Sequence, residues 1–447
     1  MSELTPPTAV VDIARRLERA GYETWCVGGA VRDALLGVPS LDWDLATAAT
    51  PAQVMRLFRR TVPVGVAHGT VGVLDDDGAL HEVTTFRRDV QTDGRHAVVE
   101  FGASLDEDLA RRDFTINAIA YSPRTGELRD PFGGRDDLRA RVLRSVGDPR
   151  ERMREDRLRA LRAIRFAARF GLEIDGPTWE AVVASAAHLT RLSAERVKQE
   201  LEKTMEQVER PAGAMRRWRD SGALAVVAPA LAALPDAQLA ALDEVRLPAR
   251  ARHPARGSLR QLTRLALLAL HLPGSAAERA FKTLKFSNEQ ARWAGEVAER
   301  WAWLGGEMTA ALTRREPVSD GELRRWAARA GRTRLAPLLR TACAYWGGAR
   351  AVGAVAPEPA VVRSIYRRAL RVAFRDPVET GDLALDGDDL RTAGIPAGPL
   401  LGKILHALLE LVVDDPSLNT RERLLSSALA QYERMRGGNP APPSAGS

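Results

Sequence analysis

Apolar positions recur at two different spacings along the chain, and the change between them divides it into two regions. Up to about residue 140, short apolar runs of strand length alternate with a few helical stretches. From residue 148 onward, apolar residues keep the three-to-four-residue spacing of amphipathic helices. We therefore predict an α+β N-terminal region with a small mixed sheet, followed by an all-α remainder.

The N-terminal pattern resolves into short elements. Predicted strands cover residues 24–27, 42–44, 60–64, 70–74 and 80–86, with a turn at 75–78. Predicted helices cover residues 8–20, 30–36 and 51–58, and residues 154–170 are predicted to form one long helix. The segment 86–101 is polar and has no steady period, so we predict a mobile loop there.

The composition is typical of a soluble globular protein. The 447 residues are 45% hydrophobic and 28% charged. No apolar run reaches membrane-spanning length, and the N-terminus lacks the basic and apolar regions of a secretory signal. Cys26 and Cys343 lie in apolar segments and are expected to be free thiols. We therefore expect a cytoplasmic protein without a membrane partner.

Positive charge is concentrated in one helical region. The whole chain carries a net charge of +7, but residues 241–380 contain 25 Lys and Arg against 13 Asp and Glu, a net +12. This excess predicts a surface for a nucleic-acid backbone, with Arg324, Arg325 and Arg332 as representative contacts. A solvated, arginine-rich helical surface remains the alternative. The tryptophans between residues 293 and 346 are expected in the core rather than stacked on RNA.

The most distinctive chemistry follows the first predicted strand. Gly28 and Gly29 allow a sharp turn into a helix whose N–H groups suit phosphate, and Arg32 lies one turn further on. Asp42 and Asp44 then share one face of a strand and suit a divalent metal. Each feature alone is commonly a plain turn or a solvated strand face, but their order within 17 residues is more specific.

The run GGAVRDALLGVPSLDWDLAT resembles the signature of nucleotidyltransferases with a polymerase-β-type palm. More narrowly, it is similar to class II tRNA nucleotidyltransferases (CCA-adding enzymes) and bacterial poly(A) polymerases. The resemblance implies that Asp42 and Asp44 are catalytic and hold Mg²⁺, and that Gly28 and Gly29 bind nucleotide. Glu82 is a candidate third carboxylate, with a salt-bridged strand residue as the alternative.

A second stretch matches the family's RRD motif. Arg111, Arg112 and Asp113 precede Asn117, and the resemblance associates them with the sugar and phosphates of the incoming nucleotide. Guanidinium groups suit phosphate, whereas Asp and Asn side chains suit hydroxyls. A surface Arg–Asp pair is the alternative reading.

A third stretch matches the family's EDxxR motif, which the resemblance associates with base reading. Asp156 accepts from the amino group of cytosine or adenine, and Arg159 donates to the adjacent ring nitrogen. Uracil and guanine present the reverse order and would be rejected. Arg162 and Arg165 continue the candidate nucleotide site. A solvent-facing ladder of ion pairs is the alternative.

Together these features predict a template-independent enzyme that adds C and A to tRNA 3′ ends from CTP and ATP, with no role for DNA. An A-adding enzyme or a poly(A) polymerase remains open, as does, more remotely, a non-catalytic RNA-binding protein. The predicted divisions are a head (1–140), a base-reading neck (141–205), a basic RNA-binding body (206–380), a tail (381–436) and a disordered end (437–447).

Overall fold

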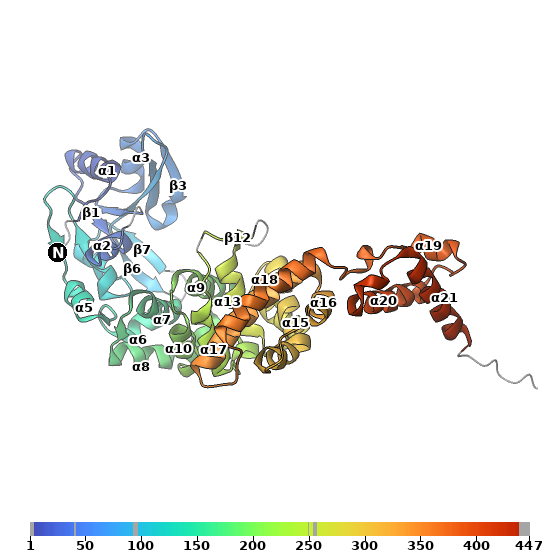
Figure 1. Ribbon diagram of the computed structural model, residues 1–447. Coiled ribbons are helices and arrows are strands. Elements are labelled where there is room, and N and C mark those ends of the chain that lie inside the picture. Colours follow the sequence, from blue (N-terminus) through green and yellow to red (C-terminus); the bar gives the residue numbers. More distant parts are fainter. Residues whose placement is uncertain (1–3, 40–41, 93–96, 249, 254–256, 438–447) are drawn as a thin grey trace, which may run out of the picture. The chain divides into compact units, whose positions relative to one another are not determined.

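The computed structural model describes residues 4–39, 42–92, 97–248, 250–253 and 257–437 (Figure 1). The chain divides into two compact units, and the boundary in the sequence lies between Ala232 and Ala233. The finer division into head, neck, body and tail remains a prediction. The predicted disordered end lies outside the described residues except for Gly437.

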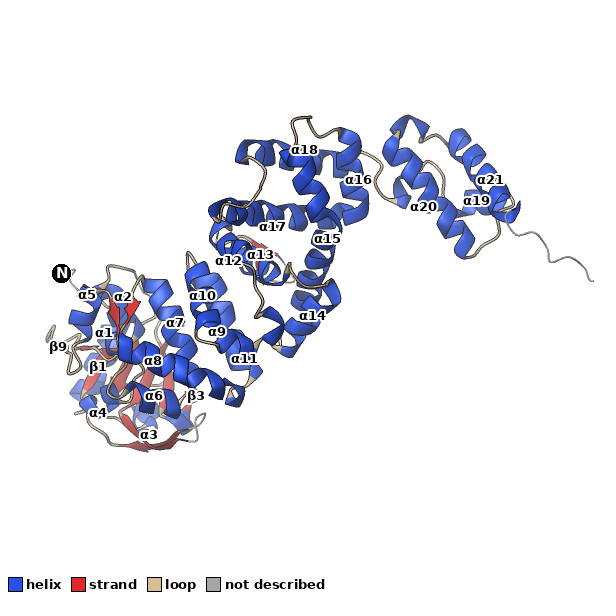
Figure 2. Cartoon of the chain, turned by 90° about the horizontal axis from the view of Figure 1, so that it is seen from below, coloured by secondary structure: helices blue, strands red, loops and turns tan. Residues whose placement is uncertain are grey.

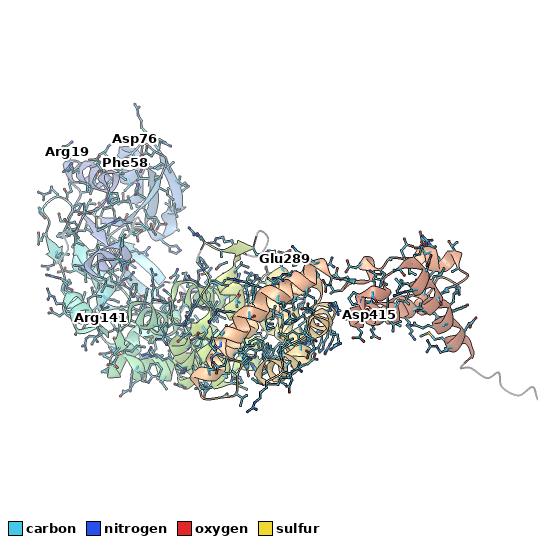
Figure 3. The ribbon with its side chains drawn as sticks, viewed as in Figure 1. Arg19, Phe58, Asp76, Arg141, Glu289 and Asp415 are labelled. Atoms are coloured by element: carbon cyan, nitrogen blue, oxygen red, sulfur yellow. The ribbon has the colours of Figure 1, made fainter. Side chains whose placement is uncertain are left out.

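The N-terminal part of unit 1 contains a seven-stranded sheet. Its strands are β1 (Thr24–Val27), β2 (Asp44–Thr47), β3 (Thr61–Gly65), β4 (Thr70–Leu74), β5 (Leu80–Thr85), β8 (Ala120–Tyr121) and β9 (Leu128–Arg129). The order is β3-β4-β5-β2-β1-β8-β9. Because β2 pairs antiparallel with β1 and parallel with β5, the sheet is mixed, as predicted. Asp76 lies on the surface in the predicted turn between β4 and β5 (Figure 3).

Helices pack on this sheet and continue beyond it through unit 1. They are α1 (Thr8–Arg19), α2 (Gly29–Leu35), α3 (Pro51–Leu57), α4 (Leu105–Ala110), α5 (Gly134–Ala140), α6 (Pro149–Glu155), α7 (Leu158–Phe170), α8 (Gly176–Ser185), α9 (Ala194–Gln207), α10 (Ala212–Asp220) and α11 (Ala223–Val227). Short additions are β10 (Val142–Leu143), β11 (Glu173–Ile174), η1 (Val66–His68), η2 (Thr115–Asn117), η3 (Ala186–Arg191) and η4 (Pro229–Leu231). Val27, Ala46, Leu109 and Ala120 share one core, which joins β1, β2 and β8 to α4.

The segment 86–101 was predicted to be an irregular loop, and this is wrong for residues 87–92 and 97–101, which form a two-stranded ribbon. Its mobility remains a prediction, and residues 93–96 lie outside the described residues. β6 (Arg87–Thr92) pairs antiparallel with β7 (Ala97–Phe101). The register shifts between Asp89 and Gln91. A bulge of this kind inserts an extra residue and breaks the two-residue alternation by which a strand is recognised in a sequence.

The predicted helix 154–170 is also interrupted, and β2 begins at Asp44 rather than at Asp42. α6 ends at Glu155, and Asp156 adopts an extended conformation with φ −146° and ψ 106°. The Asp156 carboxylate accepts a hydrogen bond from the Leu158 N–H at 3.0 Å. It thereby satisfies one of the free donors at the start of α7, which stabilises the break.

Unit 2 is almost entirely helical, as predicted (Figure 2). Its helices are α12 (Asp236–Ala241), α13 (Leu259–Ala269), α14 (Gly274–Thr283), α15 (Asn288–Thr313), α16 (Asp320–Ala330), α17 (Arg332–Ala351), α18 (Pro359–Arg375), α19 (Gly387–Thr392), α20 (Pro399–Asp414) and α21 (Arg421–Gly437). Minor elements are β12 (Arg252–His253), β13 (Gly257–Ser258), η5 (Leu242–Glu244), η6 (Thr380–Asp382) and η7 (Pro416–Leu418). Within the described ranges, no helix is long and apolar enough to span a membrane.

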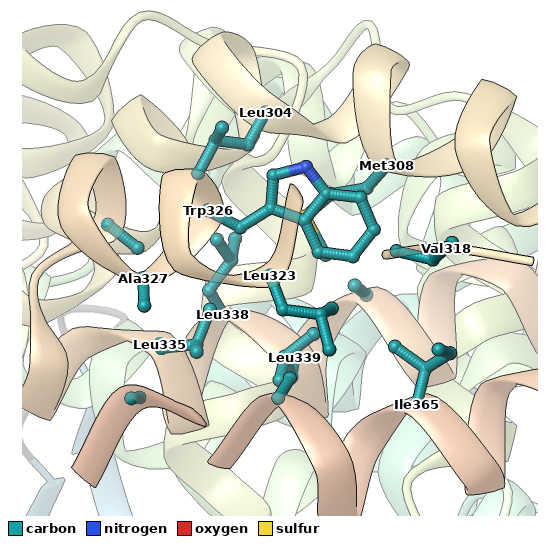
Figure 4. Close-up of a cluster of buried hydrophobic side chains, with 14 of the residues drawn as sticks. Leu304, Met308, Val318, Leu323, Trp326, Ala327, Leu335, Leu338, Leu339 and Ile365 are labelled. Atoms are coloured by element: carbon teal, nitrogen blue, oxygen red, sulfur yellow. The ribbon is translucent and has the colours of Figure 1, made fainter. Parts of the chain in front are cut away.

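The tryptophans of unit 2 mostly lie in its core, as predicted. Trp326 is 1% exposed and packs among Leu304, Met308 and Leu323 (Figure 4). Trp293 and Trp346 are likewise buried, whereas Trp303 is half exposed. A second core, built from Ile404, Leu408, Val412 and Leu424, holds the last helices together.

The three arginines expected to contact phosphate are engaged within unit 2. Arg324 donates to the Val413 carbonyl at 2.7 Å and pairs with Asp376 at 3.2 Å. Arg325 pairs with Asp414 at 2.8 Å, and Arg332 pairs with Asp382 at 2.6 Å. These contacts join α16 and α17 to the segments that follow α18 and to the end of α20. The three arginines therefore have structural partners within unit 2, and their role as contacts for an RNA backbone remains a prediction.

Candidate active site

The predicted phosphate turn has the expected geometry. Gly28 has φ 78° and ψ −132°, a conformation open to glycine, and α2 begins at the next residue. A Cβ at Gly28 would lie 3.0 Å from Arg112 Nη1, and one at Gly29 would lie 3.5 Å from Arg32 Nη2. The two glycines therefore bring the backbone directly against two guanidinium groups.

Two acidic residues flank the start of β2. Asp44 pairs with Val27 in the sheet and is half buried, whereas Asp42 is exposed and lies just before the strand. The intervening Trp43 is buried, as predicted. Burial, followed by the charges of Asp42 and Glu82, raises the pKa of Asp44 to about 6, and Arg112 opposes this rise. The charges of two further carboxylates thus act on Asp44 at this end of β2.

The donor chemistry of this edge fits a magnesium ion. Mg²⁺ prefers oxygen ligands and is commonly held by one or two carboxylates together with substrate phosphates. Asp42 and Asp44 supply such carboxylates, and a cation would relieve their mutual repulsion. Among the described residues, no group of three or more His, Cys, Asp or Glu side chains could hold a metal ion. Glu82 as a third ligand therefore remains a prediction.

The RRD residues form a paired network. Arg111 and Arg112 both bond Asp108, at 2.9 and 3.2 Å, and this carboxylate is almost fully buried. Asp113 accepts from the Asn117 amide at 2.9 Å. Burial is the largest influence on Asp113 and opposes its ionisation, but Arg162 at 2.8 Å, Asn117 and Arg159 together outweigh it, so the pKa of Asp113 lies below the ordinary value.

The EDxxR residues lie at the break before α7. The Asp156 carboxylate pairs with Arg196 at 2.7 Å as well as accepting from the Leu158 N–H. The Arg159 guanidinium pairs with Glu155 at 2.5 Å and donates to the carbonyls of Arg111 and Arg152. These contacts use three of its five N–H donors. Both candidate base-reading groups are thus held in place by neighbours.

One cavity of about 520 Å³ collects these groups. It is lined by every predicted nucleotide-binding residue and by Asp44, but not by Asp42 or Glu82. Its lining contains nine Lys and Arg side chains against three Asp, an excess of six positive charges that suits a triphosphate. Arg112 Nε and Arg196 Nη1 are buried without a hydrogen-bond partner among the described residues. A larger cavity, of about 640 Å³ beside α1, is lined by none of the predicted residues.

Known proteins match this chain over most of its length. Residues 24–144 match the family described as "Poly A polymerase head domain", and residues 171–234 match "Probable RNA and SrmB- binding site of polymerase A". The CCA-adding enzyme of Geobacillus kaustophilus is 35% identical over 94% of this chain and 96% of its own length. The CCA-adding enzyme of Latilactobacillus sakei is 35% identical over 93% and 96%. The chain belongs to the CCA-adding enzyme family.

Solved structures of CCA-adding enzymes have the same fold. The Bacillus stearothermophilus enzyme in complex with CTP is 32% identical and covers 96% of this chain and 98% of its own, with a TM-score of 0.70. The Thermotoga maritima enzyme complexed with tRNA_CCA is 20% identical and covers 94% of each chain, with a TM-score of 0.61. The predicted polymerase-β-type head and helical remainder are therefore confirmed.

The cavity of this CCA-adding enzyme family member is also lined by residues that were not predicted from the sequence. Arg196 pairs with Asp156, the candidate base-reading carboxylate. Phe166, Arg169 and Lys203 line the same cavity. The spacing of Phe166 and Arg169 from Arg162 places all three on one side of α7 and could have found them.

Proposed function

We propose that this protein adds C and A to the 3′ ends of tRNA from CTP and ATP and releases pyrophosphate. The observation that carries the proposal is the cavity of about 520 Å³ in unit 1. It joins Asp44 and the glycine turn to the base-reading candidates Asp156 and Arg159. Full-length similarity to CCA-adding enzymes supports the same reaction.

The transfer forms a bond between the tRNA 3′-oxygen and the α-phosphorus of the nucleotide, and the bond from that phosphorus to pyrophosphate breaks. Asp42 and Asp44 would hold Mg²⁺, which supplies positive charge that acidifies the 3′-hydroxyl and neutralises the leaving pyrophosphate. The arginine and lysine side chains that line the cavity orient the triphosphate. Among them, Arg112 lies closest to the glycine turn. The Asp113 carboxylate and the Asn117 amide would bind the hydroxyls of the sugar.

The choice of base depends on the hydrogen-bond acceptors of Asp156 and the donors of Arg159 that remain available to a nucleotide. Each carboxylate oxygen has two lone pairs, so Asp156 can accept from an amino group while it keeps Leu158 and Arg196. Arg159 retains two N–H donors for a ring nitrogen. Cytosine and adenine present the matching donor and acceptor, whereas uracil and guanine would leave unpaired groups that cost ~1–3 kcal/mol each.

The deciding assay supplies purified protein with tRNA that lacks CCA, or that ends after the first or second C. CTP and ATP are added singly and together. The proposal predicts completion of CCA from both nucleotides and no further growth. Incorporation of A alone onto CC-ending tRNA would identify an A-adding enzyme, and a long A tract would identify a poly(A) polymerase. Absence of pyrophosphate release with all four triphosphates would favour a non-catalytic RNA-binding protein.

Exposed arginines for which the described residues supply no ion pair are the best candidates for contacts to the tRNA backbone, and α18 offers four of them. Arg363, Arg367, Arg371 and Arg375 are exposed and recur every fourth residue, over roughly 18 Å of helix. Like charges at this spacing destabilise a helix, and bound phosphates would relieve that repulsion. We expect their joint replacement by alanine to weaken tRNA binding and to flatten the plot of log affinity against log salt by about 3 units.

Two adjacent residues of α18 provide a matched control. Arg367 is exposed, whereas Arg368 pairs with Asp320 at 2.6 Å and donates to the Val318 carbonyl at 2.7 Å. Filter binding across a salt series should give a slope about 0.7–0.9 smaller for Arg367→Ala and an unchanged slope for Arg368→Ala. Equal slopes for the two variants would remove α18 from the binding surface.

A further inference from the structure

Four arginines crowd one side of the cavity in unit 1. They are Arg32 from α2 and Arg162, Arg165 and Arg169 from α7. Burial lowers the pKa of Arg32 and of Arg165, and Arg169 lowers both further, although each has a carboxylate partner that opposes the change. Such a cluster needs strong restraints if each guanidinium is to hold one orientation.

Carboxylates restrain these groups at their edges. The pairs are Asp33 with Arg32 at 2.6 Å, Asp113 with Arg162 at 2.8 Å and Glu200 with Arg165 at 2.6 Å. Asp33 lies 3.9 Å from Arg169 as well. An edge contact fixes some N–H directions but leaves the face of the planar group unconstrained.

Two phenyl rings cover those faces. Phe166 is 5% exposed and has three guanidinium carbons over its ring, from Arg165 at 4.3 Å, Arg162 at 5.1 Å and Arg32 at 5.2 Å. Phe170 lies under Arg32 at 4.3 Å and Arg169 at 5.0 Å. The two rings stack on each other, with centroids 6.0 Å apart and planes at 19°. All five distances fall within the range of cation–π attraction.

The arrangement follows from helical spacing and from one long-range contact. On α7 the rings and their arginines occupy positions 162, 165, 166, 169 and 170, which form one stripe. Arg32 reaches this stripe from the helix that follows the glycine turn. The rings therefore join the phosphate turn to the helix that begins at the base-reading residues.

We propose that Phe166 and Phe170 are positioning residues for nucleotide binding. Their faces hold the guanidinium planes of Arg32, Arg162 and Arg165, so that the free N–H donors point to the triphosphate. This inference rests on the proposed function of the cavity. A preoriented guanidinium loses less conformational freedom when it binds, so the rings act on affinity. Because the triphosphate is common to CTP and ATP, both nucleotides are affected equally.

Fluorination tests the electrostatics of the ring without removing it. Mono-, di- and trifluorinated phenylalanine are incorporated at Phe166, which withdraws electron density from the ring face with little change of shape. The KM of CTP and of ATP should rise step by step, by about tenfold for the trifluorinated ring. The kcat and the preference for C and A over U and G should stay within about twofold, because neither reacting groups nor base contacts change.

Phe281 is the matched control. It is 1% exposed, meets Phe286 edge-on at 5.2 Å, and no cation–π contact to its ring occurs among the described residues. The same fluorinated series at Phe281 should leave KM unchanged. A flat KM across the Phe166 series, or an equal rise at Phe281, would overturn the proposal in favour of plain core packing.

A second fluorination site and a direct measurement of nucleotide binding complete the test. If fluorinated Phe166 protein does not fold, the series at the half-buried Phe170 carries the same expectation through Arg32 and Arg169. The Kd of CTP is measured beside KM. Wild-type protein that binds CTP and ATP but extends no tRNA would overturn the proposed function, whereas the Kd series would still decide whether the rings position the arginines.

Discussion

Replacing Asp44 by asparagine is expected to slow nucleotide transfer by about a thousandfold or more, while tRNA affinity stays within about twofold. A bound metal stabilises transition-state charge by several kcal/mol, and each ~1.4 kcal/mol corresponds to a factor of ten. Asparagine keeps the shape of the side chain but removes the negative charge that would hold the cation. Single-turnover extension of CC-ending tRNA with ATP measures the effect, and filter binding measures the affinity.

The unfolding temperature of Asp44→Asn shows whether its loss of transfer arises from the missing charge or from misfolding. Burial, then Asp42 and Glu82, raises the pKa of Asp44 from 3.8 to about 6. The folded state therefore binds this proton more tightly than the unfolded state, and the carboxyl's contribution to stability falls as pH rises from about 4 to 6. Asparagine cannot ionise, so Asp44→Asn should unfold at the same or a higher temperature at pH 7 in chelator. A lower unfolding temperature would point to structural damage instead.

The Glu82→Gln variant tests whether two or three carboxylates hold the metal ion. Glu82 is exposed on β5 and lies outside the lining of the cavity. We expect transfer to fall by about tenfold or less, because Glu82 contributes charge near Asp44 without holding the cation. A loss as large as that of Asp44→Asn would make Glu82 a third ligand.

Features fixed by local chain geometry could be predicted from the sequence. Gly28 needs a positive φ for the turn, and Thr70–Leu74 has the residues of a strand with a turn after it, so both are found as expected. The bulge at Asp89 and the break at Asp156 could not be found in this way. The first is a shift in strand register and the second is stabilised by a hydrogen bond, and neither is visible in the spacing of apolar residues.

Partners distant in sequence were also beyond prediction. Most of the residues that line the cavity could be named from short sequence motifs, but the pairing of Asp156 with Arg196 spans 40 residues. The charge of the region 241–380 identified a basic surface without showing which arginines are free. Arg367 and Arg368 are neighbours of the same type, yet within the described part of the chain only Arg368 is held by an ion pair. Side-chain pairing depends on tertiary packing, which local patterns do not encode.

Arg159→Ala is expected to relax base choice while transfer and tRNA binding continue. The incorporation of UTP and GTP, relative to CTP and ATP, should rise by about 10- to 100-fold. Removal of the guanidinium deletes the donor that matches the ring nitrogen of cytosine and adenine, and one such unpaired group costs ~1–3 kcal/mol. Arg159→Lys keeps a positive charge but lacks the planar fork, so its misincorporation should lie between those of the wild type and Arg159→Ala.

Arg154→Ala is the matched control for this loss of charge. Arg154 is exposed on α6, five residues before Arg159, and does not line the cavity. It should leave both base choice and the salt dependence of tRNA binding unchanged. Since Arg159 also pairs with Glu155, the unfolding temperature of each variant is measured beside misincorporation. If Arg159→Ala kept its selectivity for C and A while tRNA binding collapsed, Arg159 would be a residue for the RNA and not for the base.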